Sequence, residues 1–553
     1  MITTKILQSI LKCALPVLAS STLAVAQVNL NTMGLGEIHG NFQANAQYYI
    51  PDSTIGAADV PEKMLFNGFV NILYTKGKFT AGLRYENYLN ALQGYPAGYK
   101  GTGIPYRFIT YRSDFLEITA GSFYEQFGNG LILRTYEERN LGLDNALDGV
   151  RIKAEPVKGI YLKGLIGKQR SFFTQGPGIV RGIDGEIQFN ELFAKLADKK
   201  LIFGIGGGFL SKFQEDKDPT LVLPQNVGST AVRFNLSRNN FSLNGEYAYK
   251  INDPSLDNNF IYKHGDAILL QALYATKGFA VMLSGSRIDN MSFRSDRTAQ
   301  LTNLLINYIP ALNKQHTYSL LTFYPYAAQS KGEMEFSSEV KYKFSKGSLL
   351  GGEYGTEILV NYSGSNSLDT TNISIDKDTR KKGYTSSYFS IGPQVYFRDM
   401  YVEINKKFNK QWKSTLAYTY QVYNKDVIQK PGTGTIYANI AIVDITYKMN
   451  KGALRMEAQH MATKQDQQNW AYLLLEYTIN TNWYVAAGDL YNYGNDHANE
   501  RYHYYNISAG FIKEANRIEL SYGKQRAGVF CVGGVCRNVP ASNGVTLTIT
   551  SSF

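Results

Sequence analysis

The chain has 553 residues and a formal net charge of +11, with 51 Gly, 41 Tyr and 29 Phe but only 15 Pro. Such a length ordinarily suggests several domains, yet no Pro- or Ser-rich linker, charge run or change of composition divides the chain, which favours one large domain. The positive charges are not clustered, so nucleic acid is not indicated as a partner.

The first residues have the features of an export signal. Two lysines flank an apolar, Ala- and Leu-rich run that ends in Ala24-Val25-Ala26, and small residues at these positions fit cleavage by signal peptidase. We therefore predict a signal peptide over residues 1–26 and a mature domain over 27–553. An N-terminal membrane anchor is the alternative, although Pro16 interrupts the short apolar run. No other segment approaches the ~20 apolar residues that a membrane-spanning helix needs.

Apolar and polar residues alternate with a period of two along much of the chain. Clear examples are 38–48, 241–250, 334–344 and 412–422. This period indicates β-strands, and runs of ten or more residues exceed the length of about five or six that is usual in soluble proteins. Strands that cross a membrane at a tilt need about nine to eleven residues, so the pattern favours transmembrane strands.

The connections between these strands alternate in length. Short turns such as 75–78 and 237–240 are separated by longer Gly-, Asp-, Asn- or Pro-rich segments. Alternation of short periplasmic turns with long external loops is typical of a transmembrane barrel. The longer segments are 51–64, 91–105, 289–331 and 362–395. Aromatic residues flank the short turns and predict a girdle at one membrane interface: Tyr74, Phe79, Phe115, Phe241, Phe279, Phe344, Phe408, Trp412, Tyr447 and Trp483.

These patterns predict an all-β fold, a single antiparallel up-and-down barrel of about 24 strands. The mean hydropathy of −0.25 does not contradict this fold, because half of each strand would face a polar interior. The side chains of so wide a barrel cannot fill its interior, so water, inward-folded loops or a partner must occupy it. Hairpins could be hidden in 127–148 and 289–331.

The last strand has an apolar face at Val545, Leu547 and Ile549, and the chain ends on Phe553. A soluble edge strand could show the same alternation. The ending resembles the closing strand of bacterial outer-membrane barrels, which the insertion machinery reads. The resemblance implies that Phe553 is an insertion signal, and that outer-membrane lipid and the barrel-assembly machinery are partners.

The segment Gly128–Arg151 breaks the alternation and mixes both signs of charge with apolar residues. We expect it to fold into the lumen and narrow the pore, because charged constrictions govern selectivity in channels. A salt-bridged external loop is the alternative. The candidate constriction residues are Arg134, Glu137, Glu138, Arg139, Asp144, Asp148 and Arg151.

Two cysteines remain after the predicted cleavage, Cys531 and Cys536. Exported proteins reside where disulfides persist, so we predict a small disulfide loop at a hairpin tip. A metal site is disfavoured because no His lies nearby to complete a ligand set. Residues of opposite charge two apart on one strand face predict ion pairs on the lumen wall: Glu37 with His39, Arg84 with Glu86, Arg455 with Glu457, and Arg517 with Glu519.

Gly128–Arg151, Tyr324–Ala328 and the strand from Trp412 to Asn424 together resemble an uncharacterised family of porin-like outer-membrane β-barrel proteins from Bacteroidota. The similarity covers most of the mature chain. It implies a barrel in the outer membrane of a Gram-negative cell, and it supplies no substrate or active residues.

The leading functional hypothesis is a porin-like channel for small polar solutes. The alternative is a structural or assembly barrel that holds a partner protein in an outer-membrane complex, and an outer-membrane hydrolase is a more distant one. No GxSxG, HExxH or P-loop motif is present, so we expect no catalytic residues, cofactor or bound metal. A TonB-dependent importer is disfavoured because the first strand begins soon after the predicted cleavage site.

Overall fold

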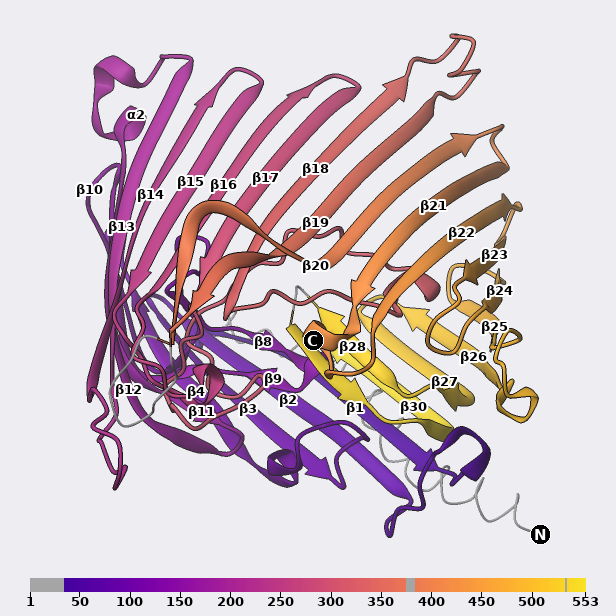
Figure 1. Cartoon of the computed structure of the whole chain (residues 1–553), viewed down its shortest axis with the longest axis horizontal. Helices are drawn as coiled ribbons and strands as arrows, with labels where there is room; N and C mark the ends of the chain where they lie inside the picture. Colours follow the sequence, from indigo (N-terminus) through magenta and orange to yellow (C-terminus); the bar gives the residue numbers. More distant parts are fainter. Residues whose placement is uncertain (1–33, 374–382, 533–534) are drawn as a thin grey trace.

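The computed structural model describes residues 34–373, 383–532 and 535–553. Twenty-four strands form one antiparallel sheet, and the last strand pairs with both its predecessor and the first, which closes the sheet into a barrel (Figure 1). The predicted all-β barrel of about 24 strands is confirmed. The predicted signal peptide, 1–26, lies outside the described residues.

The strands of the barrel are β1 (Glu37–Tyr49), β2 (Met64–Lys76), β3 (Phe79–Leu89), β4 (Gly101–Arg112), β5 (Leu116–Phe123), β10 (Leu147–Val157), β11 (Ile160–Ser171), β12 (Thr174–Gln188), β13 (Leu201–Phe213), β14 (Asn226–Arg238), β15 (Phe241–Lys250), β16 (Gly265–Thr276), β17 (Phe279–Asp289), β18 (Gly332–Phe344), β19 (Thr356–Asn372), β20 (Tyr384–Lys407), β21 (Trp412–Asn424), β22 (Thr435–Lys448), β23 (Ala453–Ala462), β24 (Trp470–Thr478), β25 (Trp483–Tyr491), β26 (His503–Lys513), β27 (Asn516–Gln525) and β30 (Ser542–Ser552).

The connections carry short elements: η2 (Ser53–Ile55), η3 (Ala97–Tyr99), β6 (Gln126–Phe127), β7 (Leu133–Arg134), β8 (Glu137–Glu138), η4 (Arg139–Leu141), β9 (Leu143–Asp144), α2 (Phe189–Leu192), η5 (Ala194–Leu196), η6 (Leu256–Asn258), η7 (Leu320–Thr322), α3 (Lys425–Ile428), η9 (Ala498–Glu500), β28 (Gly528–Val532) and β29 (Val535–Val539). Among the described residues, no helix is long and apolar enough to cross a membrane.

The two faces of the strands are those that the alternation predicts. In β21, Leu416 is on the outer face with 46% of its surface exposed, whereas Thr419 is buried on the inner face. Similar apolar side chains encircle the barrel. Because the sheet is closed, each strand edge is paired with a neighbouring strand and does not face lipid, which cannot form hydrogen bonds with backbone N–H and C=O groups. This outer belt includes Leu83, Ile109, Ile152, Ile183, Val232, Leu270, Leu416, Leu475, Ile507 and Leu520.

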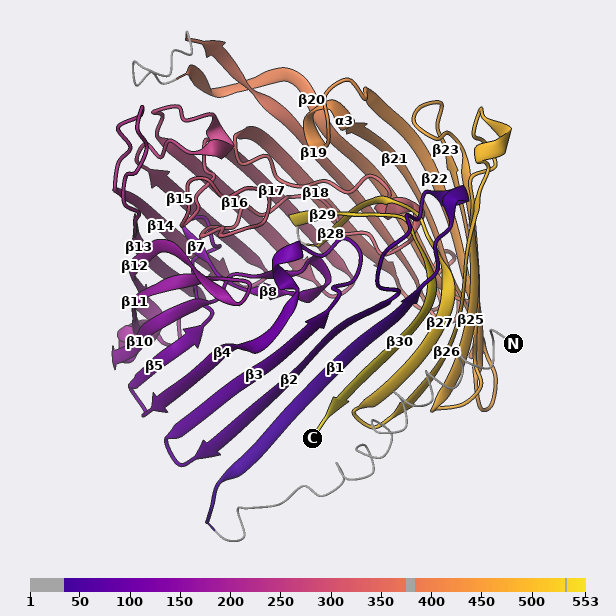
Figure 2. The ribbon, with the colours of Figure 1, turned by 90° about the horizontal axis from the view of Figure 1, so that it is seen from below.

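Most short turns lie at one end of the barrel, together with Phe553 (Figure 2). Aromatic pairs cross neighbouring strands there: Trp412 lies 4.6 Å from Tyr447 and Trp483 lies 4.8 Å from Phe511, measured between ring centroids. The sorting of loops by length is not strict, however. At this end β18 and β19 are joined by 345–355, whereas at the opposite end β11 and β12 are joined by two residues, 172–173.

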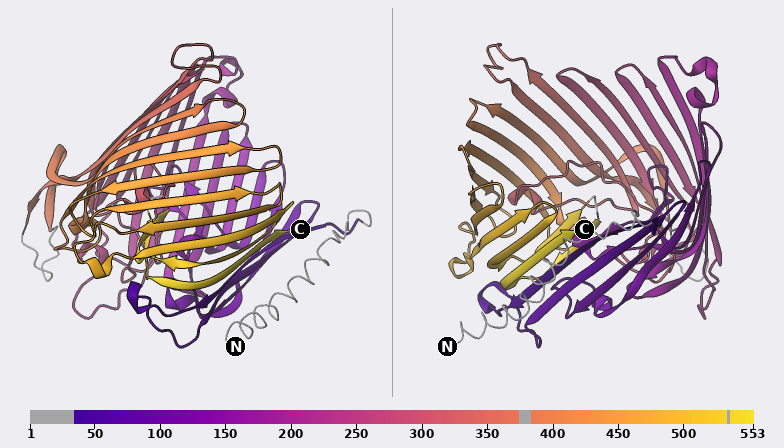
Figure 3. Two further views of the ribbon diagram at one scale, coloured as in Figure 1. Left: turned by 90° about the vertical axis from the view of Figure 1, so that its right-hand side faces the viewer. Right: turned by 180° about the vertical axis from the view of Figure 1, so that it is seen from behind.

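The predicted loop 362–395 is wrong in extent, because β19 continues to Asn372 and β20 begins at Tyr384. The two strands form a long hairpin that extends beyond the rest of the barrel (Figure 3). Tyr384 and Ser386 donate hydrogen bonds to Asp289 at the rim of β17. Further along the hairpin, Phe389 is 87% exposed.

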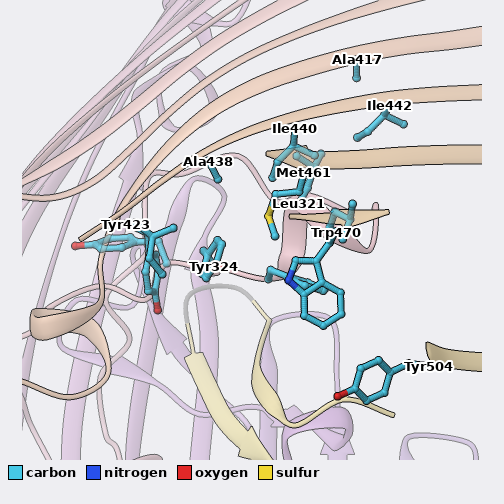
Figure 4. Packing of buried hydrophobic residues seen from close by; sticks show 14 of the residues in the cluster. Leu321, Tyr324, Ala417, Tyr423, Ala438, Ile440, Ile442, Met461, Trp470 and Tyr504 are labelled. Atoms are coloured by element: carbon cyan, nitrogen blue, oxygen red, sulfur yellow. The ribbon is translucent and has the colours of Figure 1, made fainter. Parts of the chain in front are cut away.

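Three connections fold into the barrel: 124–146, 290–331 and, in its described residues, 526–532 with 535–541. They are here called the first, second and third luminal segments. Neither of the first two adds a strand to the wall, and the expectation of an external loop at 289–331 is wrong. The second luminal segment contributes Phe293 and Ile306 to a hydrophobic cluster on the inner faces of β11–β17. It then contributes Leu321 and Tyr324 to another cluster, on the inner faces of β19–β24 (Figure 4). The segment therefore crosses the lumen from one wall to the other.

Candidate functional site

The structure divides the predicted constriction residues between two locations. Arg134, Glu137, Glu138, Arg139 and Asp144 lie on the first luminal segment, whereas Asp148 and Arg151 belong to the wall strand β10. The expected inward loop thus carries five of the seven residues.

A cluster of buried ion pairs anchors the first luminal segment to the wall. Arg84 of β3 is only 3% exposed and lies 3.1 Å from Glu86 on the same strand and 2.9 Å from Asp144 on the segment. It also binds Glu137. Arg170 of β11 bridges Asp144 and Glu86 from the other side. Two wall arginines therefore hold two carboxylates of the segment.

Sequence spacing predicted only part of this cluster. The predicted pairs of Arg84 with Glu86, Arg455 with Glu457, Arg517 with Glu519 and His39 with Glu37 are all confirmed as contacts. Arg170 was missed, because its carboxylate partners lie far from it in the sequence.

The environment of Glu137 favours the charged form of its carboxyl group. The Nε atom of Arg139 donates to it at 2.6 Å, and the guanidinium of Arg139 lies over the ring of Phe69. Burial opposes the charge on Glu137, but hydrogen bonds and positive charge from Arg139 and Arg84 outweigh that effect and lower the pKa of Glu137 below its ordinary value. The segment is thus held by charge-assisted hydrogen bonds.

The first and second luminal segments are joined by their main chains. The amide of Arg134 donates to the carbonyl of Ile306 at 2.9 Å, and the amide of Tyr308 donates to the carbonyl of Gly130 at 3.0 Å. The guanidinium of Arg134 lies over the ring of Tyr308, 4.0 Å from its centroid. Arg134 therefore connects the two segments.

The remaining predicted residues have local roles. Glu138 accepts a hydrogen bond from the amide of Asn140 and caps η4. Asp148 contacts two neighbouring side chains of the wall, Arg107 and Gln175. Arg151 pairs with Glu117 at 2.6 Å and donates to the carbonyl of Tyr124.

Glycines on the inner face of the wall make room for the luminal segments. An added Cβ at Gly178 of β12 would lie 2.0 Å from the carbonyl oxygen of Ser295 in the second luminal segment. At Gly182 it would lie 2.9 Å from the ring of Phe127 in the first. On β13, Gly208 continues this seat, because an added Cβ there would lie 3.3 Å from Ile132 of the first luminal segment. Added Cβ atoms at Gly204 and Gly206 would instead meet side chains of the wall.

The third luminal segment is the hairpin of β28 and β29. Cys531 and Cys536 are partners across it and form a disulfide. Arg526, at its beginning, lies with its guanidinium 3.9 Å from the centroid of the Phe323 ring, and burial lowers the pKa of Arg526 from its ordinary value. Arg537 lies over Tyr95, on the side of the first luminal segment.

A cavity of about 770 Å³ remains between the second and third luminal segments and the wall. The wall contributes, among others, Gln421 of β21, Tyr472 of β24, Leu490 of β25 and Tyr504 of β26 to its lining. In the described part of the chain, no group of three His, Cys, Asp or Glu side chains is arranged to hold a metal ion.

A closed 24-stranded barrel with an apolar outer belt is an outer-membrane-type β-barrel. The chain belongs to the family of unknown function DUF6029, whose model matches residues 7–553. This match is silent on bacterial lineage, so an origin in Bacteroidota stays a prediction. A search of the curated proteins found no match.

Solved structures of outer-membrane proteins align with most of the chain at low similarity. A mutant of the ferric enterobactin receptor PfeA from Pseudomonas aeruginosa is 11% identical, with a TM-score of 0.42 over 94% of this chain and 81% of that chain. The outer membrane protein opdK from the same organism is 9% identical, with a TM-score of 0.35 over 94% and 98%. OccAB1 from Acinetobacter baumannii is 10% identical, with a TM-score of 0.32 over 93% and 96%. These values are too low to carry function to this chain.

Proposed function

We propose that the protein is a porin-like transport barrel of the outer membrane, which passes small polar solutes along a lumen narrowed by its own luminal segments. The observation that carries this proposal is the second luminal segment, which packs on both walls and crosses the lumen between them. The wall around it presents ionised side chains such as Arg455, which pairs with Asp444. Charged walls and constrictions are the means by which channels select solutes.

The sequence led us to expect a wide lumen without a plug domain, and this proposal modifies that expectation. A barrel of 24 strands would be wide if empty, but three connections fold into it. Conductance of the native protein is therefore expected to be small for a barrel of this size, and the luminal segments are expected to control it.

The pairing between β17 and β18, the strands that flank the second luminal segment, allows a direct test of this proposal. Asp289 and Gly332 are paired on neighbouring strands, so a two-residue turn can replace the whole second luminal segment without shifting the register. In planar bilayers the native protein should give small, steady, ohmic openings, and the excised variant should conduct several-fold more current because the crossing segment is gone.

A matched control removes a loop that does not line the cavity of about 770 Å³. Tyr491 and His503 are also paired, so 492–502 can be replaced in the same way, and conductance should then stay at the native level. Silence from folded native protein and from the folded variant without 290–331 would refute transport.

A specific observation favours a second candidate, a barrel that holds a partner in an outer-membrane complex. The hairpin of β19 and β20 presents Tyr388, Phe389 and Ile391 to the exterior, and exposed aromatic residues are common in protein interfaces. Copurification of a stable partner that is lost in the Phe389→Ser variant would support this role. Recovery of the native barrel alone would argue against it.

A further inference from the structure

The cavity between the second and third luminal segments has the size of a small-molecule site. Its volume of about 770 Å³ lies within the range of roughly 300–1,000 Å³ that is usual for ligand pockets. It is bounded by 313–326 on one side, 526–531 on another and the wall strands β20, β21 and β24–β27 on the third.

Aromatic side chains make up much of the cavity lining. Phe323, Tyr324 and Tyr326 come from the second luminal segment and Phe530 from the third, while Tyr504 projects from the wall. Phe323 is fixed by an edge-on contact with Trp470, at 5.2 Å between ring centroids. In Figure 4, Trp470 lies below Leu321, with Tyr504 further below and Tyr324 to the left. Rings held in this way suit a flat apolar body.

The cavity contains one uncommitted positive charge, that of Arg526. Within the described residues its guanidinium makes no ion pair, and no Asp or Glu lines the cavity. Asp466, which acts on Arg526 through space, is already bound by Lys425 at 2.8 Å and by the hydroxyl of Tyr324 at 3.2 Å. The charge of Arg526 is therefore available to a ligand.

The other basic side chains of the lining are already paired. Lys314 contacts Glu339, His316 contacts Asp399 and Lys524 contacts Asp52. A polar group of the wall also lacks a partner: Gln421 is 1% exposed, and its side-chain oxygen makes no hydrogen bond within the described part of the chain. Buried amide groups of this kind are ordinarily satisfied, so water or a ligand is expected beside it.

We propose that this cavity binds an organic monoanion with a flat apolar body, its carboxylate held by Arg526 and its body packed on Phe323, Tyr504 and Phe530. A guanidinium presents paired donors that match a carboxylate. A polyanion fits poorly, because only one cation is uncommitted and the remaining charges would be desolvated without partners. The identification of this monoanion as the transported solute rests on the proposed transport function. Its binding to the cavity can be measured without transport.

Equilibrium binding to the full chain tests the proposal. The chain has three Trp, and two of them, Trp412 and Trp483, lie at the short-turn end, so the W412F/W483F variant reports Trp470 alone. Titration with 4-phenylbutyrate should change the emission of Trp470. The uncharged 4-phenylbutanamide should bind about tenfold more weakly, because it forgoes a charge-assisted hydrogen bond.

Arg526→Gln should reduce the affinity for 4-phenylbutyrate about tenfold and leave that for the amide unchanged. Arg537→Gln is the matched control, since Arg537 lies on the same hairpin and over an aromatic ring but outside the cavity lining. It should leave both affinities unchanged.

Equal binding of the acid and the amide to native protein would overturn the proposal, as would equal losses in the two arginine variants. If Arg526→Gln does not fold, the comparison of the two ligands on native protein still decides. Barrels that conduct but bind neither ligand would overturn the proposed site and leave the proposed transport function standing. Barrels that bind 4-phenylbutyrate but do not conduct would support the site and contradict transport.

Discussion

In the ion-paired half of the lumen, formed by β3–β5, β10–β17 and the first luminal segment, two buried arginines have carboxylate partners: Arg84 and Arg170 lie among Glu86, Glu137 and Asp144. In the aromatic half, formed by β19–β27 with 313–326 and the third luminal segment, Arg526 rests on Phe323 and pairs with no carboxylate among the described residues. Matched charges fix a segment in place, whereas an unmatched charge beside a cavity is available to a ligand.

The second luminal segment belongs to both halves. Its first part is pressed against Gly178 and bonded to the first luminal segment, so it is fixed by close packing. Its second part lines the cavity with Phe323 and Tyr324. One half therefore serves as an anchor for a segment whose far end forms a binding surface in the other.

The largest effect that separates the halves should come from Arg84→Met. Removing one partner of a buried ion-pair cluster leaves carboxylates uncompensated, which costs about 3–5 kcal/mol. We expect this loss in the free energy of unfolding, together with protease cleavage within 124–146. Arg517→Met removes a half-exposed pair with Glu519 and should cost less than about 1 kcal/mol. Equal losses would contradict the special role of the cluster.

Charged substitutions on the outer face, in contrast, should have the same effect on stability in both halves. Ile183 and Leu416 are exposed on the outer face of β12 and β21, and arginine at either position should cost roughly 2–4 kcal/mol near the bilayer midplane. Thr415→Arg, on the inner face of β21, should spare folding and alter ion selectivity. Unfolding titrations in lipid would measure the free energy of unfolding of all three variants. Equal losses of stability at Thr415 and Leu416 would contradict the assigned faces.

A smaller effect should show how tightly the second luminal segment is seated. Gly178→Val places a side chain where the carbonyl of Ser295 now lies, and such overpacking costs typically about 1–3 kcal/mol. Conductance should rise as the segment shifts. Gly185→Val is the control on the same strand, because an added Cβ there has no neighbour closer than 3.4 Å. A change in conductance from Gly185→Val but not from Gly178→Val would argue against the seat.

Much of the wall was predictable because its signal is local. Alternation with a period of two identifies β15, β18 and β21 and assigns Leu416 to the outer face, and pairs two residues apart, such as Arg84 with Glu86, follow from the same period. The ends of β19 and β20 were not predictable in this way, since pairing between the two strands, rather than composition, extends them beyond the barrel.

The luminal site was harder to predict because its contacts are distant in sequence. The first luminal segment was identifiable from its mixed charges, but its wall partner Arg170 was not. The second luminal segment has no period, and its apolar residues, such as Phe293 and Leu321, find their partners on opposite walls. Arg526 is a single residue in a loop, and only the fold shows that no carboxylate of the described residues pairs with it.

The smallest expected effect is a pH dependence in the attachment of the first luminal segment to the wall. Burial opposes the charges of Glu125 and Glu137. Lysine partners of Glu125 and arginine partners of Glu137 outweigh this effect, so the pKa of each carboxyl group is lowered in the folded protein. A carboxyl group whose pKa is lowered by folding contributes stability above its unfolded value of about 4.3, and this contribution is lost as the pH falls through the folded value. Cleavage within 124–146 by an acid-active protease should therefore increase below about pH 4, and less so in Glu137→Gln, which has no such charge to lose. Because Arg526 stays protonated throughout this range, 4-phenylbutyrate binding should weaken only as the ligand's own carboxylate is protonated. An identical acid response in Glu137→Gln would place the titrating group outside the cluster.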